Sequence, residues 1–389
     1  MSSLSYIFRA SILPTLLLLY VFYRVILPRK VLKPIYRFLF GGLLLFLIIR
    51  PLIFLCAGGS ISSPHLSAFF IEYSGVVLFA VLILAVFILL RDIFLLFTML
   101  LAKIFHCKSL GFTLERKFIV PSLLVAFALS FYGNYNAHLL PVVRNYTVVS
   151  KDLPSSFDGF KIAFISDTHV WQGRGKDFMQ SVVDITNKQN CQLVLLGGDY
   201  LDGAVEDFGE ALLPLKNLRH TVGIFAVPGN HEYYFDYAGW KKFFEEKLNI
   251  TVLINQHKKI VSSNGQAIFV TGVPDILAGK IGEKMPDVNH ALPVLDKPSF
   301  IILLCHRPDE ASKNNNFGID LQLSGHTHGG LVPFLSKIVA CFNDGFVVGQ
   351  YNLSHMTLIV TRGAGYWQGF AERIASPAEI SVITLKCKK

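Results

Sequence analysis

Long apolar runs fill the first third of the chain. A helix needs about 20 mainly apolar residues to cross the hydrocarbon core of a bilayer, and four stretches come near that length: 7–27, 38–56, 67–90 and 118–133. The sequence therefore predicts an all-α transmembrane segment of about four helices. The further run 93–105 is too short to cross alone. It either extends the third span or lies at the interface, and a fifth span is the alternative.

The pattern changes at Lys161, where short apolar runs of strand length begin, each ending in polar or glycine-rich residues. Segments 177–189 and 237–248 have the length of helices. This alternation is typical of an α/β domain with buried strands. We therefore divide the chain into a transmembrane helical anchor, residues 1–150, and a soluble domain, residues 151–389. The strand-like runs are 161–166, 192–197, 221–228, 299–305 and 320–324.

Charge follows the same division. Residues 1–150 contain 13 Lys and Arg against 3 Asp and Glu, whereas residues 151–389 contain 23 against 24. The formal net charge of +9 thus belongs to the flanks of the apolar spans, and the near-neutral soluble half argues against a nucleic-acid partner. The six cysteines form no C-x-x-C pair, so neither a structural zinc site nor a disulfide is indicated.

The loops predict which side of the membrane each segment occupies. Five Lys or Arg lie in 24–37, at the end of the first span and before the second, and five lie in 91–117, while 57–66 contains none. Positive loops face the cytoplasm, so four spans would place the soluble domain on the extracytoplasmic face, and a fifth span would invert this. Arg24 and the basic residues after it argue against a cleaved signal peptide. The first span is therefore expected to stay in the mature protein.

Few ionisable residues interrupt the spans, which favours anchoring over transport. Arg50 lies near the end of the second span, where its side chain could snorkel towards the interface, and Arg91 and Asp92 lie at a span end. A transport pathway would need more such groups within the membrane.

Polar side chains follow each predicted strand of the soluble half. Strand ends are where α/β folds place their chemistry, and five strands that converge on one edge would bring imidazole, carboxylate and amide donors together. Such donors suit Zn, Fe, Mn and similar ions. The segments are Asp167-Thr168-His169, Gly198-Asp199-Tyr200-Leu201-Asp202, Gly229-Asn230-His231-Glu232, His306 and Gly325-His326-Thr327-His328.

Two such ions about 3.5–4 Å apart can clamp the attacking and leaving oxygens during phosphoryl hydrolysis. This arrangement needs one carboxylate able to bridge them. Asp199, in the middle motif, is the candidate.

The ordered motifs D-x-H, G-D-x-x-D, G-N-H-E, a lone His and G-H-x-H resemble the calcineurin-like metallophosphoesterase superfamily, over roughly residues 155–385. The sequences GNHEYY, GHTHGG and GAGYWQGF resemble its bacterial membrane-anchored branch. The resemblance implies a four-layer αββα sandwich after the transmembrane helices, with two divalent metal ions (Mn, Fe, Zn or similar) as cofactors.

Carried over motif by motif, the resemblance also implies a role for each site residue. Asp167, His169 and His328 would hold the first metal ion, and Asp199 would bridge the two ions. His231 would donate a proton or hydrogen bond to the leaving oxygen. Asp202 would orient a ligand from behind, as metal-bound histidines usually require. The remaining ligands, which would hold the second ion, are Asn230, His306 and His326.

We therefore expect a hydrolase that cleaves a phosphate ester or anhydride at the membrane surface, with a phospholipid, a lipid-linked pyrophosphate or a cell-envelope phosphodiester as substrate. One alternative is a UDP-sugar-lipid or nucleotide pyrophosphatase on the cytoplasmic face. Another is a membrane sensor that binds metal without turnover. The segment 275–298 and the aromatic residues Tyr233, Tyr234 and Trp240 are candidates for shaping substrate entry or contacting an apolar substrate. The sequence gives no indication of the oligomeric state.

Overall fold

The computed structural model describes residues 3–28, 31–60, 63–106, 116–297 and 299–388. Two compact units form within it. The first comprises residues 1–135 together with the short segment Gly369–Ala371, and the second comprises residues 136–368 and 372–389.

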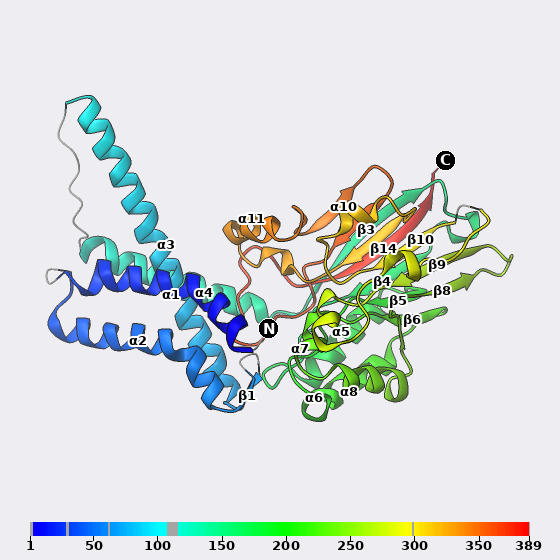
Figure 1. Ribbon diagram of the computed structural model, residues 1–389, viewed down its shortest axis with the longest axis horizontal. Helices are drawn as coiled ribbons and strands as arrows, with labels where there is room; N and C mark the ends of the chain where they lie inside the picture. Colours follow the sequence, from blue (N-terminus) through cyan, green and yellow to red (C-terminus); the bar gives the residue numbers. More distant parts are fainter. Residues whose placement is uncertain (1–2, 29–30, 61–62, 107–115, 298, 389) are drawn as a thin grey trace. The chain divides into compact units, whose positions relative to one another are not determined.

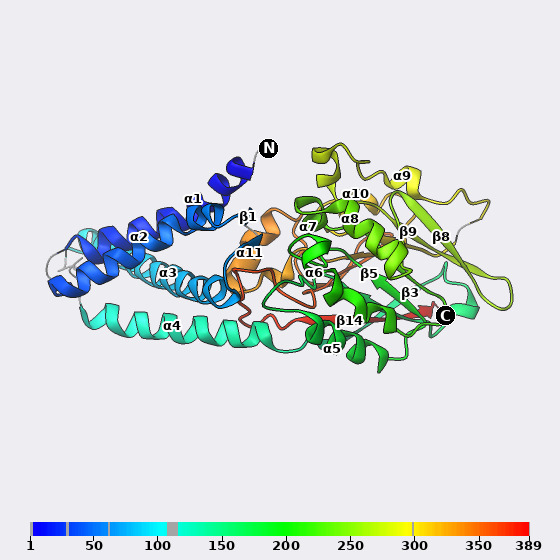
Figure 2. The same ribbon diagram turned by 90° about the horizontal axis from the view of Figure 1, so that it is seen from below.

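The first unit is helical. Two of its helices run alongside each other in both views, and the longest crosses them steeply in the first view (Figures 1 and 2). Proline occupies the first position of α2, where its missing N–H costs nothing, and Ser67 caps α3 by accepting from the Phe70 N–H at 3.3 Å. The helices are α1 (Ser3–Val21), continued by the π-helical turn η1 (Phe22–Ile26), α2 (Pro34–Cys56), α3 (Ala68–Ile104) and α4 (Arg116–His138), with the short strands β1 (Gly59–Ser60) and β2 (Ser63–Pro64) between α2 and α3.

The prediction of four spans is corrected to three. In the described part of the chain, Pro34–Cys56, Ala68–Ile104 and Lys117–His138 are long and apolar enough to cross a membrane. The predicted first span is helical, and Ser11–Ile26 within it is a shorter apolar helix that does not count among the three. The run 93–105 continues α3 to Ile104, so it extends the third span as one reading expected.

Two charged side chains of the helical unit, Asp92 and Arg50, have hydrogen-bond partners within it. Asp92 accepts from the Tyr20 hydroxyl at 2.6 Å, from Arg24 at 2.8 Å and from Arg91 at 3.2 Å. Arg50 does not snorkel as the sequence suggested. It is 9% exposed and donates to Ser74 Oγ at 2.8 Å, because a hydroxyl on the neighbouring helix satisfies the guanidinium inside the unit. These pairings are consistent with an anchor.

Two mixed six-stranded sheets form the framework of the second unit. The first has the order β3-β14-β4-β5-β6-β7, in which β4, β5, β6 and β7 are parallel and β14 is antiparallel to β4. Its strands are β3 (Val142–Ser150), β4 (Lys161–Ile165), β5 (Leu193–Leu196), β6 (Gly223–Ala226), β7 (Thr251–Val252) and β14 (Glu379–Cys387).

The second sheet has the order β12-β13-β11-β10-β9-β8, with β9, β10, β11 and β13 parallel and an antiparallel strand at each edge. Its strands are β8 (Gln256–Val261), β9 (Ala267–Gly272), β10 (Ile301–Leu304), β11 (Leu321–Ser324), β12 (Gly349–Asn352) and β13 (Thr357–Val360).

Buried side chains between and outside the sheets show the layers. Phe164 and Ile383 of one sheet and Ile302 and Ile359 of the other belong to one buried cluster, which joins the two inner faces. A second cluster packs α5 and α8 on the first sheet, and a third packs α9 and α10 on the second. Helices therefore cover both outer faces of a sandwich of two sheets.

The five predicted strands are confirmed, as are helices near 177–189 and 237–248. They do not converge on one sheet edge, however, since β4, β5 and β6 lie in one sheet and β10 and β11 in the other. The helical elements of the second unit are η2 (Ser155–Phe157), α5 (Lys176–Asn187), α6 (Val205–Leu212), η3 (Leu213–Asn217), α7 (Asn230–Tyr234), α8 (Tyr237–Lys242), η4 (Phe243–Lys247), η5 (Ile276–Ile281), α9 (Val288–Ala291), α10 (Ala311–Asn314), η6 (His328–Gly330) and α11 (Pro333–Cys341).

Candidate metal centre

The predicted ligands all follow the carboxyl ends of parallel strands. β4, β5 and β6 lead to the motifs from Asp167 to His231, and β10 and β11 lead to the histidines from His306 to His328. Five of these residues have left-handed backbone conformations with φ between 43° and 69°. Such conformations cost about 1–3 kcal/mol each and collect at functional sites. The five are Asp167, His169, Asp199, His326 and His328.

Glycines allow these strand ends to approach closely. A methyl group on Gly229 would collide with the Asp199 carboxylate, and one on Gly325 would collide with Ser166 and the Asp167 carboxylate. Gly198 has φ of 97°, which only glycine adopts readily. The glycines of the motifs therefore provide space for the carboxylates.

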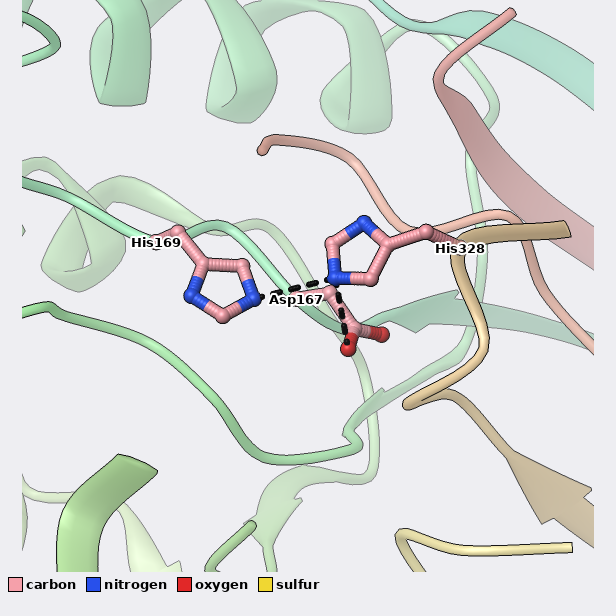
Figure 3. Close-up of side chains that lie close together, drawn as sticks. All are labelled: Asp167, His169 and His328. Atoms are coloured by element: carbon pink, nitrogen blue, oxygen red, sulfur yellow. Dashed lines mark hydrogen bonds and ion pairs between the residues drawn. The ribbon is translucent and has the colours of Figure 1, made fainter. Parts of the chain in front are cut away.

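One group of donors consists of Asp167, His169 and His328, whose side chains converge from two segments far apart in the sequence (Figure 3). Nε2 of His328 lies 3.1 Å from Nε2 of His169 and 3.5 Å from Oδ1 of Asp167. All three residues are at most 1% exposed. The structure thus brings together the residues predicted for the first ion.

A second group consists of Asp199, His306 and His326, with one donor atom of each within 4.8 Å of the others. Nε2 of His306 lies 3.2 Å from Oδ2 of Asp199. Its Nδ1 lies 2.7 Å from the Gly197 carbonyl, which therefore accepts the Nδ1 proton and leaves Nε2 directed at Asp199. Asn230, predicted for the same ion, is buried and opens α7 directly after Gly229.

Asp199 faces both groups of donors. Its Oδ2 atom is 3.2 Å from Nε2 of His306 and 3.8 Å from Nε2 of His169. Burial alone would raise the pKa of Asp199, but the charges of His306 and His231 outweigh burial and hold this pKa well below its ordinary value. Asp199 is thus an ionised carboxylate that faces donors of both groups.

His231 lies beside the two groups of donors, and Asp202 orients its ring. Its Nδ1 lies 2.7 Å from Oδ1 of Asp202, and its Nε2 lies 3.9 Å from Oδ2 of Asp199. The same Asp202 oxygen lies 2.8 Å from Nδ1 of His169. The side chain of His231 is 14% exposed, so it can be reached from solvent, while His169, His306 and His328 are buried.

Buried polar atoms without a hydrogen-bond partner indicate whether these donors suit a metal ion. Oδ2 of Asp167 and Oδ1 of Asn230 are buried and accept no hydrogen bond from any described residue, although buried acceptors are nearly always paired. Burial and neighbouring cations lower the pKa values of His326 and His328 well below the usual value. Neutral imidazoles and unpaired oxygens are the state that divalent ions bind, so these residues fit two ions.

Several residues around the centre were not predicted. Glu232 is fully buried and accepts N–H groups of Asp199 at 2.9 Å, Tyr200 at 2.7 Å and Gly229 at 2.8 Å. It therefore ties the loops after β5 and β6 together. Its place within G-N-H-E was visible in the sequence, but its partners were not.

Arg373 and Trp367 come from the segment after β13. Nη2 of Arg373 lies 3.2 Å from Nδ1 of His328, and this fully buried guanidinium also donates to the carbonyl of Arg362 at 2.8 Å. The ring centroid of Trp367 is 4.7 Å from that of His328. The sequence G-A-G-Y-W-Q-G-F was noted for its resemblance alone, since nothing local indicated that it packs against the ligands.

The three aromatic residues considered for substrate contact differ in their exposure. Trp240 is fully buried and Tyr233 is 7% exposed, and both belong to the core on the outer face of the first sheet. Tyr234 is 41% exposed, with its ring centroid 5.4 Å from that of His231. Packing therefore explains Tyr233 and Trp240, and Tyr234 is the one at the rim of the site.

Comparison with known proteins agrees with this geometry. The family model described as calcineurin-like phosphoesterase matches residues 160–330. A metallophosphoesterase of Bacillus subtilis, itself uncharacterized, is 30% identical over 264 residues, which cover 66% of this chain and 89% of that protein. The chain belongs to the calcineurin-like metallophosphoesterase family. The family assignment gives the ordered motifs and the two groups of donors a common explanation.

Two further metallophosphoesterases are similar to this chain over a smaller share of their own length. An uncharacterized metallophosphoesterase of Helicobacter pylori is 37% identical over 228 residues, which are 58% of this chain and 59% of that protein. A transmembrane protein with a metallophosphoesterase domain from Danio rerio is 33% identical over 276 residues, 69% of this chain and 62% of that protein. This chain thus spans about three fifths of those two relatives. With the three apolar helices, the second match indicates a multi-pass membrane metallophosphoesterase.

Proposed function

We propose that this metallophosphoesterase is a two-metal-dependent hydrolase of a phosphate ester or anhydride, acting at the membrane surface. The observation that carries the proposal is the position of Asp199, whose Oδ2 faces His306 of one donor group at 3.2 Å and His169 of the other at 3.8 Å. A carboxylate shared between two donor groups is what a pair of ions a few ångströms apart requires. Manganese, iron or zinc would suit this mixture of imidazole and oxygen donors.

Each donor group would hold one ion. Asp167, His169 and His328 are the ligands we assign to the first, and Asn230, His306 and His326 to the second, with Asp199 shared. When bound, the two ions supply an activated water and neutralise charge on the phosphoryl oxygens. Because only Asp167 and Asp199 bring formal negative charge, two divalent ions would leave the centre positive. A positive centre attracts an anionic substrate.

His231 is the residue we assign to proton transfer. Burial would lower its pKa, but the negative charges of Asp199 and Asp202 raise it to about 9. Bound cations would offset part of that negative charge and bring the pKa down towards neutrality, where a general acid is most effective. Asp202 holds Nδ1, so Nε2 is the atom left to donate to the leaving oxygen.

A lipid or a cell-envelope phosphodiester or pyrophosphate is the substrate class that anchoring favours. Three apolar helices would hold the domain near the headgroups and raise the local concentration of such substrates. The basic residues at 24–37 and 91–117 and the uncharged loop 57–66 would place α2, α3 and α4 so that the domain emerges outside the cytoplasm. Whether α1 crosses affects only the side of the amino terminus. Activity of a carboxy-terminal reporter enzyme fused to the chain, assayed on each side, tests this.

Hydrolysis is tested with the purified full chain, stripped of metal and reloaded with manganese, iron or zinc. The assay compares phosphomonoesters, phosphodiesters, UDP-sugar lipids, nucleotides and lipid pyrophosphates. We expect hydrolysis that requires metal and is highest on a lipid or envelope substrate. Preference for nucleotides with a cytoplasmic reporter signal would instead support a cytoplasmic pyrophosphatase. A chain that binds two ions and hydrolyses none of the panel would contradict the assignment as a hydrolase. It would favour the metal-binding sensor.

A further inference from the structure

Asp275 and Arg307 form an ion pair at the ends of two neighbouring strands. Gly272 of β9 and Leu304 of β10 are in register in a parallel pair, and each of the two charged residues lies three positions further along the chain. Residues equally far past the ends of paired parallel strands lie close together. Nε of Arg307 accordingly donates to Oδ2 of Asp275.

The acidic partner of this pair is fixed in place. Asp275 is 3% exposed, and its Oδ1 accepts the N–H of Leu277 at 2.9 Å at the start of η5. It lies in the segment 275–298 that the sequence suggested for shaping substrate entry. Its carboxylate holds one edge of the guanidinium and thereby fixes the direction in which the other edge points.

The other edge of the guanidinium lies beside the metal centre. Nη1 of Arg307 is 3.2 Å from Nε2 of His326, and Nη2 donates to no described residue. The side chain is 21% exposed, which leaves it open to solvent.

The contact between Arg307 and His326 is incompatible with a His326 that binds metal. If Nε2 were the ligand atom, its lone pair would be committed to the ion and Nη1 would lose its acceptor. If Nδ1 were the ligand atom, the neutral ring would carry its proton on Nε2, and two donors would face each other. In both cases Nη1 joins Nη2 as a donor without a partner at the mouth of the centre.

We propose that Arg307 is a substrate-binding residue that contacts the non-bridging oxygens of the phosphoryl group, with Asp275 as its positioning residue. The inference rests on the proposed function for the identity of the anion. A guanidinium held through Nε presents Nη1 and Nη2 as a planar fork, which matches two oxygens of one phosphate. A lysine has only a single point of charge and could not contact Asp275 and a phosphate in the same way.

The test uses the full chain loaded with manganese and inorganic phosphate as the probe. Phosphate binding is measured by isothermal titration calorimetry, and bound metal by mass spectrometry, for the wild type, Arg307→Gln and Arg307→Lys. Arg219→Gln serves as the matched control, because Arg219 is an exposed arginine away from the centre. We expect both Arg307 variants to keep two ions per chain and to bind phosphate about tenfold more weakly or worse. The control should match the wild type.

Wild-type phosphate affinity in both Arg307 variants would overturn the inference, as would a wild type that binds no phosphate. Loss of metal from both variants would overturn it too, because Arg307 would then support His326 rather than the substrate. If Arg307→Gln does not fold, Arg307→Lys still tests the claim, since it keeps the charge opposite Asp275. These readouts are independent of turnover. A chain that binds phosphate through Arg307 but hydrolyses no substrate would contradict the proposed function and not this inference.

Discussion

Nδ1 of His231 donates a hydrogen bond to Oδ1 of Asp202 over 2.7 Å. The same oxygen lies 2.8 Å from Nδ1 of His169, and the other oxygen accepts the Gln368 N–H at 3.0 Å. One carboxylate therefore fixes the ring of a predicted ligand and the ring of the predicted proton donor. Both histidines are left with Nε2 facing Asp199.

Replacing Asp202 should weaken metal binding and turnover together. In Asp202→Asn the amide cannot accept from both histidines and from Gln368, so the ligand ring loses its fixed orientation. Loss of such supporting contacts typically costs about 10–100-fold in metal affinity or activity. Competition with a chelator measures the affinity. Asp207→Asn, at an exposed carboxylate of α6, is the control, and equal affinities in the two variants would refute the orienting role.

Replacing His231 should separate chemistry from metal binding. His231→Gln removes the proton donor but none of the ligands assigned to either ion. General acid–base groups contribute about 10²–10⁴-fold, so kcat should fall by at least about a hundredfold while two ions per chain remain. Steady-state kinetics and metal analysis on the same preparation measure kcat and the number of bound ions. Near wild-type kcat would show that another group protonates the leaving oxygen.

Replacing Gly229 should disrupt the centre through packing alone. A methyl group there collides with Asp199 and approaches the ring of His306, so Gly229→Ala must move a bridging carboxylate or a ligand. We expect lower metal content and little activity. Gly175→Ala adds the same methyl group where no atom lies within 4 Å. Metal content and turnover of Gly229→Ala that match those of Gly175→Ala would argue against this packing account.

Asp320 should make stability fall as the pH rises. Burial raises its pKa to about 6, whereas an unfolded aspartate has a pKa of about 3.9. The folded state therefore binds this proton more tightly. Its stabilising effect is complete below about pH 4 and is lost as the pH rises through about 6.

Asp320→Asn is a suitable test of that pH dependence. Asp320 accepts from Ser150 Oγ at 2.7 Å and from the Ile301 N–H at 2.9 Å, and an amide keeps both contacts if the Ser150 hydroxyl rotates to accept. Melting temperatures of the two proteins should converge near pH 4, and the variant should be the more stable above pH 6. Parallel curves across this range would show that Asp320 does not titrate as described.

The two groups of metal-binding candidates were predictable because their chemistry lies in short local patterns. Asp167 and His169, or His326 and His328, occur two residues apart directly after an apolar run, and parallel strands place all such ends together. The sequence did not reveal that the runs belong to two sheets. Apolar runs such as 192–197 and 299–305 are alike in composition, and only strand pairing assigns them to different sheets.

Residues that act through distant partners escaped prediction. Arg307 carries a charge beside a predicted ligand, but its role depends on Asp275, 32 positions earlier. Arg373 reaches His328 across 45 positions. The span count differed at α1, where Ser11–Ile26 is a shorter apolar helix that contains Arg24 and is not among the three.

The most direct test of the two-metal centre is anomalous diffraction from crystals of the manganese-loaded protein, measured above and below the manganese absorption edge. The account predicts two anomalous peaks per chain. One would lie among Asp167, His169 and His328, the other among Asn230, His306 and His326, with Asp199 between them. A single peak, or peaks away from Asp199, would contradict it.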